Sequence, residues 1–171
     1  SLYTMKRYLL VALLALCSSS ITWSQEWKET EDNLGDTIVH TRSYFNQDQP
    51  IEDSLGVHTV VTKYANYYLL ETKWYGLNNK IAEDARGIHK KEKFWKYFKF
   101  YNKDNEPLTT VTDPYDYEQS DATYCTYHFD EKGNLLEVAY FKDKVDYDDE
   151  HRVIMRKPLK AVEAYQGMIH K

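Results

Sequence analysis

The sequence predicts a mainly β protein: an antiparallel meander of about seven to eight strands, forming a curved sheet or barrel, with a C-terminal helix. The first observation behind this prediction is the density of residues that favour strands, including 16 Tyr, 6 Phe and 4 Trp in 171 residues. The second is a set of similar turns at nearly regular spacing. The third is a final segment whose apolar residues recur at helical spacing.

Residues 5–24 have the pattern of a cleavable secretory signal. Two basic residues follow Met5 directly, and an uncharged apolar run occupies residues 8–16. This run is too short to span a bilayer, which takes about 20 apolar residues. Thr22 and Ser24 hold the small-residue places of a cleavage site.

Cleavage after Ser24 gives a single exported β domain, residues 25–171, which we expect in the periplasm or outside the cell. Residues 1–4 fit neither the signal nor the domain, and we treat them as upstream or artefactual residues. Cys17 allows an alternative in which a lipid on its thiol anchors the protein to a membrane. Leu16 argues against that alternative, since a small residue normally precedes the lipid-bearing cysteine.

The charge of the expected mature chain is acidic. The signal removes two of the 22 basic residues and none of the 27 acidic ones, so residues 25–171 carry a formal charge of −7. An acidic surface is repelled by phosphate backbones and by anionic lipid. We therefore expect no nucleic-acid partner, and no membrane span once the signal is removed.

Cys125 is the one cysteine between residues 25 and 171, so an intramolecular disulfide is excluded there. The fold has to rest on its apolar core, which is feasible at this length. The run 123–127 around Cys125 resembles a strand, and no nearby base or basic cluster activates the thiol. We therefore interpret Cys125 as a buried, inert residue.

Four segments share one pattern: an aromatic residue, polar residues that include Asn or Asp, a turn residue and an aliphatic residue. They begin at Phe45, Tyr75, Tyr101 and Phe129, which are 30, 26 and 28 residues apart. This spacing favours four degenerate copies of one hairpin unit, although four unrelated turns in a turn-rich protein remain an alternative. The predicted hairpin tips are residues 46–50, 77–80, 103–106 and 131–134.

Residues 129–135, with the sequence FDEKGNL, resemble the hairpins of YD-repeat (RHS-type) proteins, whose signature is Y-D-x-x-G-x-L. Phe129 stands in the place of the tyrosine. The other three segments lack the glycine and the full signature. The resemblance implies a hairpin turn at this place and no particular function.

Residues 94–101 are ambiguous, because their aromatic residues also fit one face of a helix; their density and the turn that follows favour a strand. The strand pattern fails between residues 81 and 93, where 82–86 could form a helical turn. The C-terminal helix is expected to start at Pro158. The predicted strands are 37–45, 57–64, 67–74, 94–101, 108–112, 123–129 and 135–141.

The chain contains none of the common nucleotide-binding, hydrolase or zinc motifs, so we predict no catalytic residue, cofactor or metal. Two weaker patterns remain. His128, with Asp130 and Glu137, could form the acid–base cluster of a small secreted hydrolase. The acidic residues of segment 143–151 could hold Ca²⁺, but they lack the glycine of an EF-hand loop, and a solvated loop is the preferred interpretation.

The composition favours recognition over catalysis, because residues 25–171 retain 14 Tyr and three Trp. We predict a non-enzymatic binding protein that holds an unknown protein or small ligand on a Tyr/Trp-rich surface or in a cavity. One alternative is the hydrolase, and another is a lipocalin-like carrier, although the G-x-W signature is absent around Trp27. The candidate ligand-binding residues are Tyr68, Trp74, Trp95, Tyr97, Tyr115 and Tyr117.

Overall fold

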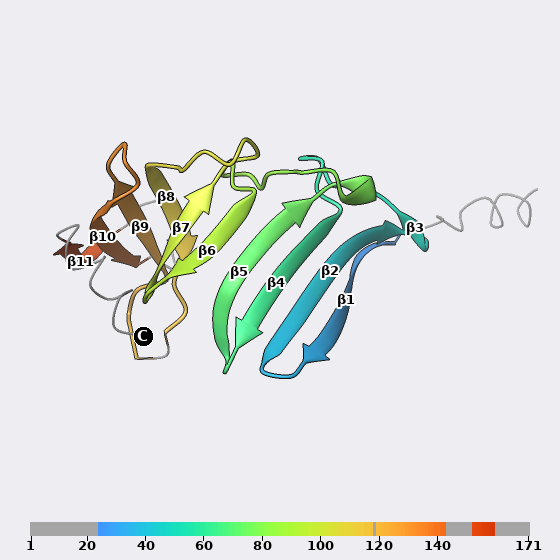
Figure 1. Ribbon diagram of the computed structural model, residues 1–171, viewed down its shortest axis with the longest axis horizontal. Coiled ribbons are helices and arrows are strands. Elements are labelled where there is room, and N and C mark those ends of the chain that lie inside the picture. The colour runs from blue at the N-terminus through green and yellow to red at the C-terminus, as the bar shows by residue number, and fades with distance from the viewer. Residues whose placement is uncertain (1–23, 118, 143–151, 160–171) are drawn as a thin grey trace, which may run out of the picture.

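The computed structural model describes residues 24–117, 119–142 and 152–159, which form two antiparallel sheets. Their strands follow one another in nearly chain order from one end of the molecule to the other (Figure 1). The first sheet contains β1 (Gln25–Leu34), β2 (Thr37–Asn46), β3 (Gln49–Pro50), β4 (Thr59–Ala65), β5 (Tyr68–Tyr75), β6 (Lys90–Phe94) and β7 (Tyr97–Tyr101). The second contains β8 (Thr110–Pro114), β9 (Tyr124–Phe129), β10 (Leu135–Lys142) and β11 (Arg152–Pro158).

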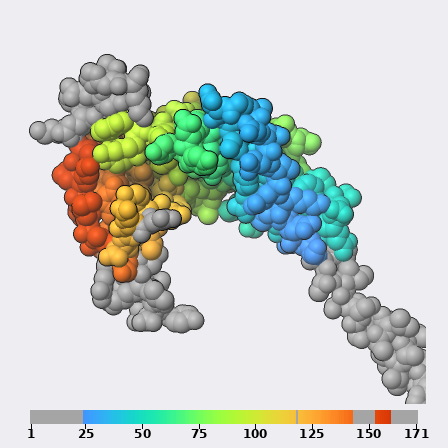
Figure 2. All heavy atoms as spheres, turned by 90° about the horizontal axis from the view of Figure 1, so that it is seen from below, coloured from blue at the N-terminus to red at the C-terminus, as the bar shows by residue number. Residues whose placement is uncertain are grey.

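The sheets form an open arch, as the space-filling view shows (Figure 2). The described strands do not close into a barrel, since β1 and β11 are edge strands. The prediction of a mainly β, antiparallel fold is confirmed, but eleven described strands in two sheets replace the single meander of seven to eight strands, and the barrel form is wrong. The lipocalin-like alternative loses the closed barrel on which it depended.

In the first sheet, tight two-residue turns join β1 to β2, β4 to β5 and β6 to β7, and these turns lie along the bottom of Figure 1. Asn66 and Tyr67 join β4 to β5 with φ of 49° and 67°. Trp95 opens the turn from β6 to β7 with φ of 54°. This left-handed conformation is unusual for a large residue. The turn explains why the predicted strand 94–101 is only partly correct: β7 covers residues 97–101, but β6 ends at Phe94, and no turn-forming residue marks the break.

Longer loops lie along the opposite edge, and one turn recurs in them. A side-chain oxygen of an Asp or Asn accepts the backbone N–H groups two and four residues later, at 2.8–3.1 Å. The residue three positions later has a φ between 59° and 82°, which favours Gly or Asn. The side chains that accept these bonds are Asp53, Asp84, Asn102 and Asp130.

The four segments predicted as hairpin tips are turns, but of several kinds. Residues 131–134 join β9 to β10, as the YD-repeat resemblance implies. Residues 46–50 join β2 to the two-residue β3, and 77–80 contain the 3-10 helix η1 (Leu77–Asn79). The turn at 103–106 is closed by an isolated bridge between Tyr101 and Pro107.

The predicted C-terminal helix is wrong at its expected start. Pro158 ends strand β11, and the backbone N–H of Leu159 donates to the carbonyl of Leu136 at 2.7 Å. The remainder of that helix, residues 160–171, lies outside the described residues, as does the acidic segment 143–151. The described residues include no helix long and apolar enough to cross a membrane.

The apolar core lies where the end of the first sheet packs on the second. The β1–β5 strands instead form a layer with little burial, in which only Thr62 and Thr72 are buried. Cross-strand contacts hold that layer, such as the Trp27–Tyr44 ring stack at 4.8 Å. The core cluster consists of Ile88, Tyr97, Phe100, Val111, Cys125, Tyr127, Phe129, Leu135, Val138 and Leu159.

Candidate binding site

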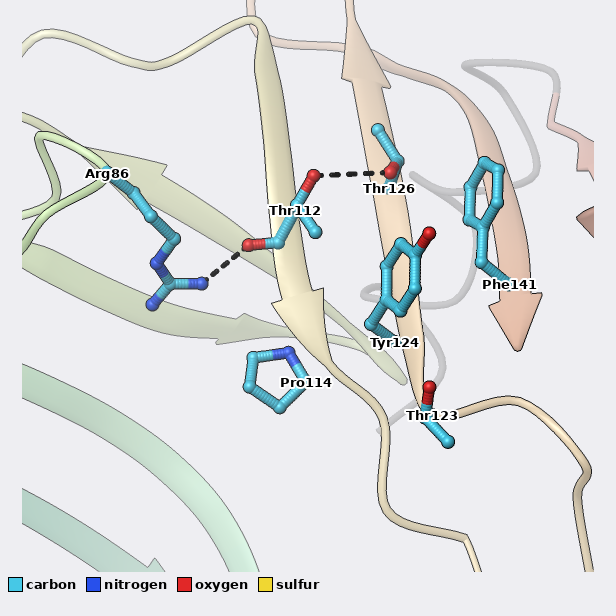
Figure 3. Close-up of a pocket in the computed structure, with 7 residues that line it drawn as sticks. All are labelled: Arg86, Thr112, Pro114, Thr123, Tyr124, Thr126 and Phe141. Carbon is cyan, nitrogen blue, oxygen red and sulfur yellow. Dashed lines mark hydrogen bonds between the residues drawn. The ribbon is translucent and has the colours of Figure 1, made fainter. Parts of the chain in front are cut away.

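A wide hollow of about 890 Å³ opens on one face of the second sheet (Figure 3). Strands β8, β9 and β10 supply most of its wall, and the loop before β6 supplies Arg86. Its volume lies within the range of about 300–1,000 Å³ that is usual for ligand pockets. We call it the aromatic hollow, and its described lining residues are Arg86, Thr112, Pro114, Thr123, Tyr124, Thr126 and Phe141.

Strand alternation decides which residues reach the hollow. In β8, Val111 and Asp113 are buried while Thr112 and Pro114 are exposed. In β9, Cys125 and the alternate residues after it are buried while the residues between them are half-buried. Because successive side chains point to opposite faces, one face of these strands enters the core and the other lines the hollow.

The hollow combines flat aromatic surface with hydroxyl groups. Tyr124 pairs with Phe141 across β9 and β10, and their rings stack at 5.0 Å with an angle of 4°. Thr112 pairs with Thr126 across β8 and β9, with their hydroxyl oxygens 3.3 Å apart. Figure 3 shows these two pairs side by side, with Pro114 next to them. The arrangement places a stacked aromatic pair beside hydrogen-bonding groups.

A charged cluster supports this wall. Arg86 donates to the backbone carbonyl of Thr112 at 2.7 Å and to the carboxylates of Asp113 and Asp84, each at 2.8 Å. Lys91 donates to the second oxygen of Asp113 at 2.6 Å. Burial disfavours the guanidinium charge, but the two carboxylates outweigh burial and raise the pKa of Arg86. The cluster ties β6 and its preceding loop to β8.

A second space of about 290 Å³ lies against the opposite face of the second sheet. Cys125 and Tyr127 reach it from the buried side of β9, and Tyr97 reaches it from the start of β7. The rings of Tyr115 and Tyr140 meet edge to face at 5.0 Å. We call it the tyrosine cavity, and its described lining residues are Lys96, Tyr97, Tyr115, Cys125, Tyr127, Tyr140 and Lys157.

Burial keeps the acidic groups of the tyrosine cavity protonated. It raises the pKa of the Cys125 thiol to about 11 and that of Tyr140 to about 12, and it also raises those of Tyr115 and Tyr127. Neighbouring phenol groups contribute smaller upward shifts. The cavity therefore presents neutral O–H and S–H groups at physiological pH. The thiol is not activated, in agreement with the expectation of an inert Cys125.

The structure gathers four of the six predicted ligand-binding residues near the tyrosine cavity. Tyr97 and Tyr115 line it. The Trp95 ring meets that of Tyr97 edge to face at 6.0 Å, and Tyr117 is exposed, 6.4 Å from Tyr115. The other two predicted residues lie elsewhere: Trp74 is half-buried against the core, and Tyr68 is exposed on β5 with the Lys93 ammonium over its ring.

The sequence prediction missed the lining of the aromatic hollow entirely. The run 123–129 was expected to be a strand, and its alternation already separated Tyr124 and Thr126 from Cys125 and Tyr127. Phe141 and Thr112 could be added only from the pairing of β9 with its two neighbours. The alternation of side chains along β9 could therefore have identified Tyr124 and Thr126 from the sequence, whereas the register between strands could not be read from it.

In the acid–base cluster suggested for a hydrolase, the carboxylates of Asp130 and Glu137 already accept hydrogen bonds from other residues of the protein. Both carboxylate oxygens of Asp130 accept hydrogen bonds within its turn, from Asn134 and Lys132. Glu137 lies opposite His128 across β9 and β10, and it accepts a hydrogen bond from Arg156 at 2.8 Å.

Among residues 24–117, 119–142 and 152–159, no group of three or more His, Cys, Asp or Glu side chains is placed to hold a metal.

The fold and the site define a class in structural terms: an open, antiparallel β protein with recurrent Asx turns and an aromatic hollow on its second sheet. No family model, curated protein or solved structure matches the chain.

Proposed function

We propose that this chain is a binding protein that holds a neutral, hydroxylated ring compound, of the saccharide class, in the aromatic hollow. The stacked Tyr124–Phe141 pair beside the Thr112–Thr126 hydroxyl pair carries this proposal. A sugar ring has an apolar C–H face that packs on an aromatic ring and a rim of hydroxyls that bonds to side-chain oxygens.

The charges around the hollow favour a neutral ligand. Arg86 is its one described charged lining residue, and two carboxylates already balance its guanidinium. An anionic ligand would therefore meet little net attraction there. The described lining also lacks a group that would act as a nucleophile with an adjacent base, so binding is favoured over catalysis.

The test is calorimetric titration of the full chain with soluble disaccharides: cellobiose, maltose, lactose and diacetylchitobiose. We expect at least one to bind, and we expect Tyr124→Ala to weaken that binding about tenfold or more, because the substitution removes one ring of the stacked pair. Tyr68→Ala is the matched control, since it truncates a tyrosine that is 65% exposed on the first sheet. Absence of binding by all four sugars, or equal affinities for native chain and Tyr124→Ala, would refute the proposal.

We further propose that the protein acts after export. The signal pattern of residues 5–24 supports this, and the first strand begins at Gln25, the expected first residue of the processed chain. Processing there would leave every described strand intact. Residues 1–23 themselves lie outside the described residues.

Intact-mass analysis of the protein from its native host tests the export proposal. We expect a chain that starts at Gln25, because Thr22 and Ser24 satisfy the cleavage-site pattern. A lipid on Cys17 would show the anchored alternative instead. An unprocessed Met5 would contradict export through this signal.

A further inference from the structure

Arg86 brings hydrogen-bond donors to the aromatic hollow that the described protein leaves unused. Its Nε donates to Asp84, and its Nη1 donates both to the Thr112 carbonyl and to Asp113. Its Nη2 group forms no hydrogen bond within the described part of the chain. Since Arg86 lines the hollow and its side chain is 30% exposed, Nη2 is the part of the guanidinium that can donate to a ligand there.

The three hydrogen bonds hold the guanidinium of Arg86 in one orientation. Figure 3 shows Nη1 directed at the Thr112 carbonyl and the other terminal nitrogen turned away from β8. A donor that is already fixed loses little conformational freedom when a ligand binds. Arg86 is therefore placed to choose between ligands by the position of their acceptor atoms.

The chemistry of Nη2 limits the group that it can meet. A guanidinium only donates hydrogen bonds, so the ligand atom beside it must be an acceptor. Asp84 and Asp113 already balance the charge of Arg86, which leaves a carboxylate ligand little net attraction. An amide carbonyl is a neutral acceptor and, unlike a hydroxyl, it has no proton of its own to place. The donor thus favours a ligand with an amide group beside its ring.

An apolar side chain separates this donor from the stacked aromatic pair. Pro114, an exposed residue at the end of β8, lies between Arg86 and the Tyr124–Phe141 pair in Figure 3. A ligand whose sugar ring packs on the pair would cross Pro114 before it reaches Arg86. An acetamido group carries a methyl group, which can pack on Pro114, and a carbonyl oxygen, which can accept from Nη2.

We propose that the aromatic hollow selects N-acetylated sugars, and that Arg86 determines this selectivity through a hydrogen bond from Nη2 to the acetamido carbonyl. The inference rests on the proposed function, because it names the class of saccharide that the hollow takes. It gives Arg86 a role beyond its structural link between β8 and the loop before β6. Loss of the hydrogen bond removes the preference for acetamido sugars and leaves saccharide binding in place.

The selectivity is tested by calorimetric titration of the full chain with diacetylchitobiose and with cellobiose. These disaccharides share one skeleton and differ only where acetamido groups replace hydroxyls. We expect diacetylchitobiose to bind about tenfold or more tightly, the effect of one hydrogen bond to a charged group. Equal affinities, or tighter binding of cellobiose, would overturn this inference and leave the saccharide proposal standing. Absence of binding by all four disaccharides would refute the saccharide proposal itself.

Arg86→Lys separates selection from structural support. The lysine keeps a positive charge beside Asp113 but lacks the second terminal nitrogen. We expect it to weaken diacetylchitobiose binding about tenfold and cellobiose binding less than about twofold, so that the preference disappears. Arg42→Lys is the matched control, because Arg42 is 45% exposed on β2 of the first sheet.

A purely structural role for Arg86 predicts a different result. The Arg86→Lys chain would then bind both sugars more weakly by the same factor and keep the preference, which would overturn the inference. Circular dichroism checks that the variant is folded. The comparison of the two sugars on the native chain does not depend on the folding of any variant.

Discussion

The Asp113→Asn substitution is expected to lower the free energy of unfolding by about 3 kcal/mol, the lower end of the range for removing one partner of a buried ion pair. The side chain of Asp113 is only 4% exposed, and it accepts hydrogen bonds from both Lys91 and Arg86. After the substitution Lys91, itself 13% exposed, would lack a balancing charge, whereas Asp84 would still balance Arg86. Urea unfolding followed by circular dichroism measures the change.

Two further variants test the cause of this loss. Asp48→Asn removes a carboxylate that is 83% exposed and paired with Lys28, and it should leave the unfolding midpoint unchanged. Adding Lys91→Met to Asp113→Asn removes the unbalanced ammonium and should recover part of the stability. Strictly additive effects of these two substitutions would contradict a direct interaction between them.

The Phe100→Ala substitution is expected to cost about 3 to 5 kcal/mol, the usual penalty for emptying a buried aromatic site. Phe100 is 1% exposed, and its ring contacts that of Tyr127 at 5.2 Å, so it joins the last strand of the first sheet to the second. The loss is a large share of the roughly 5 to 15 kcal/mol that stabilises an ordinary domain. Denaturant titration with both fluorescence and circular dichroism measures it.

Leu136→Ala is the control for Phe100, because Leu136 is a large apolar residue of β10 that is 46% exposed. We expect it to cost less than about 1 kcal/mol. Similar losses for the two variants would mean that the contact between the sheets does not carry the stability assigned to it.

The hairpin between β9 and β10 could be predicted because residues close together in the sequence form its turn. Within 129–135, an Asp carboxylate accepts two backbone N–H groups and Gly133 adopts φ of 82°, a conformation that glycine adopts at low cost. The same turn occurs at Asp53 and Asp84, inside the related sequences EDSLGVH and EDARGIH at 52–58 and 83–89. The predicted repeat was aligned on aromatic residues, so it included the turns at Asn102 and Asp130 but not those at Asp53 and Asp84.

The sequence analysis missed the elements that depend on contacts between residues far apart in the chain. Strand β1, with the sequence QEWKETEDNL, is polar on both faces, and it is held by pairing with β2 rather than by burial. The turn at Trp95 has none of the residues that normally permit its backbone angles. The binding surfaces could not be assembled for a similar reason: Tyr124 and Phe141 are separated in sequence, and only strand register brings them together.

Two-dimensional ¹H–¹⁵N spectra of the full chain, recorded during titration with each of the four disaccharides, show whether the aromatic hollow is a ligand site. We expect at least one sugar to shift the amide signals of Thr112, Tyr124, Thr126 and Phe141, which share one face of β8, β9 and β10, while those of Tyr67 and Tyr68 stay in place. Shifts confined to the first sheet, or unchanged spectra with all four sugars, would contradict it.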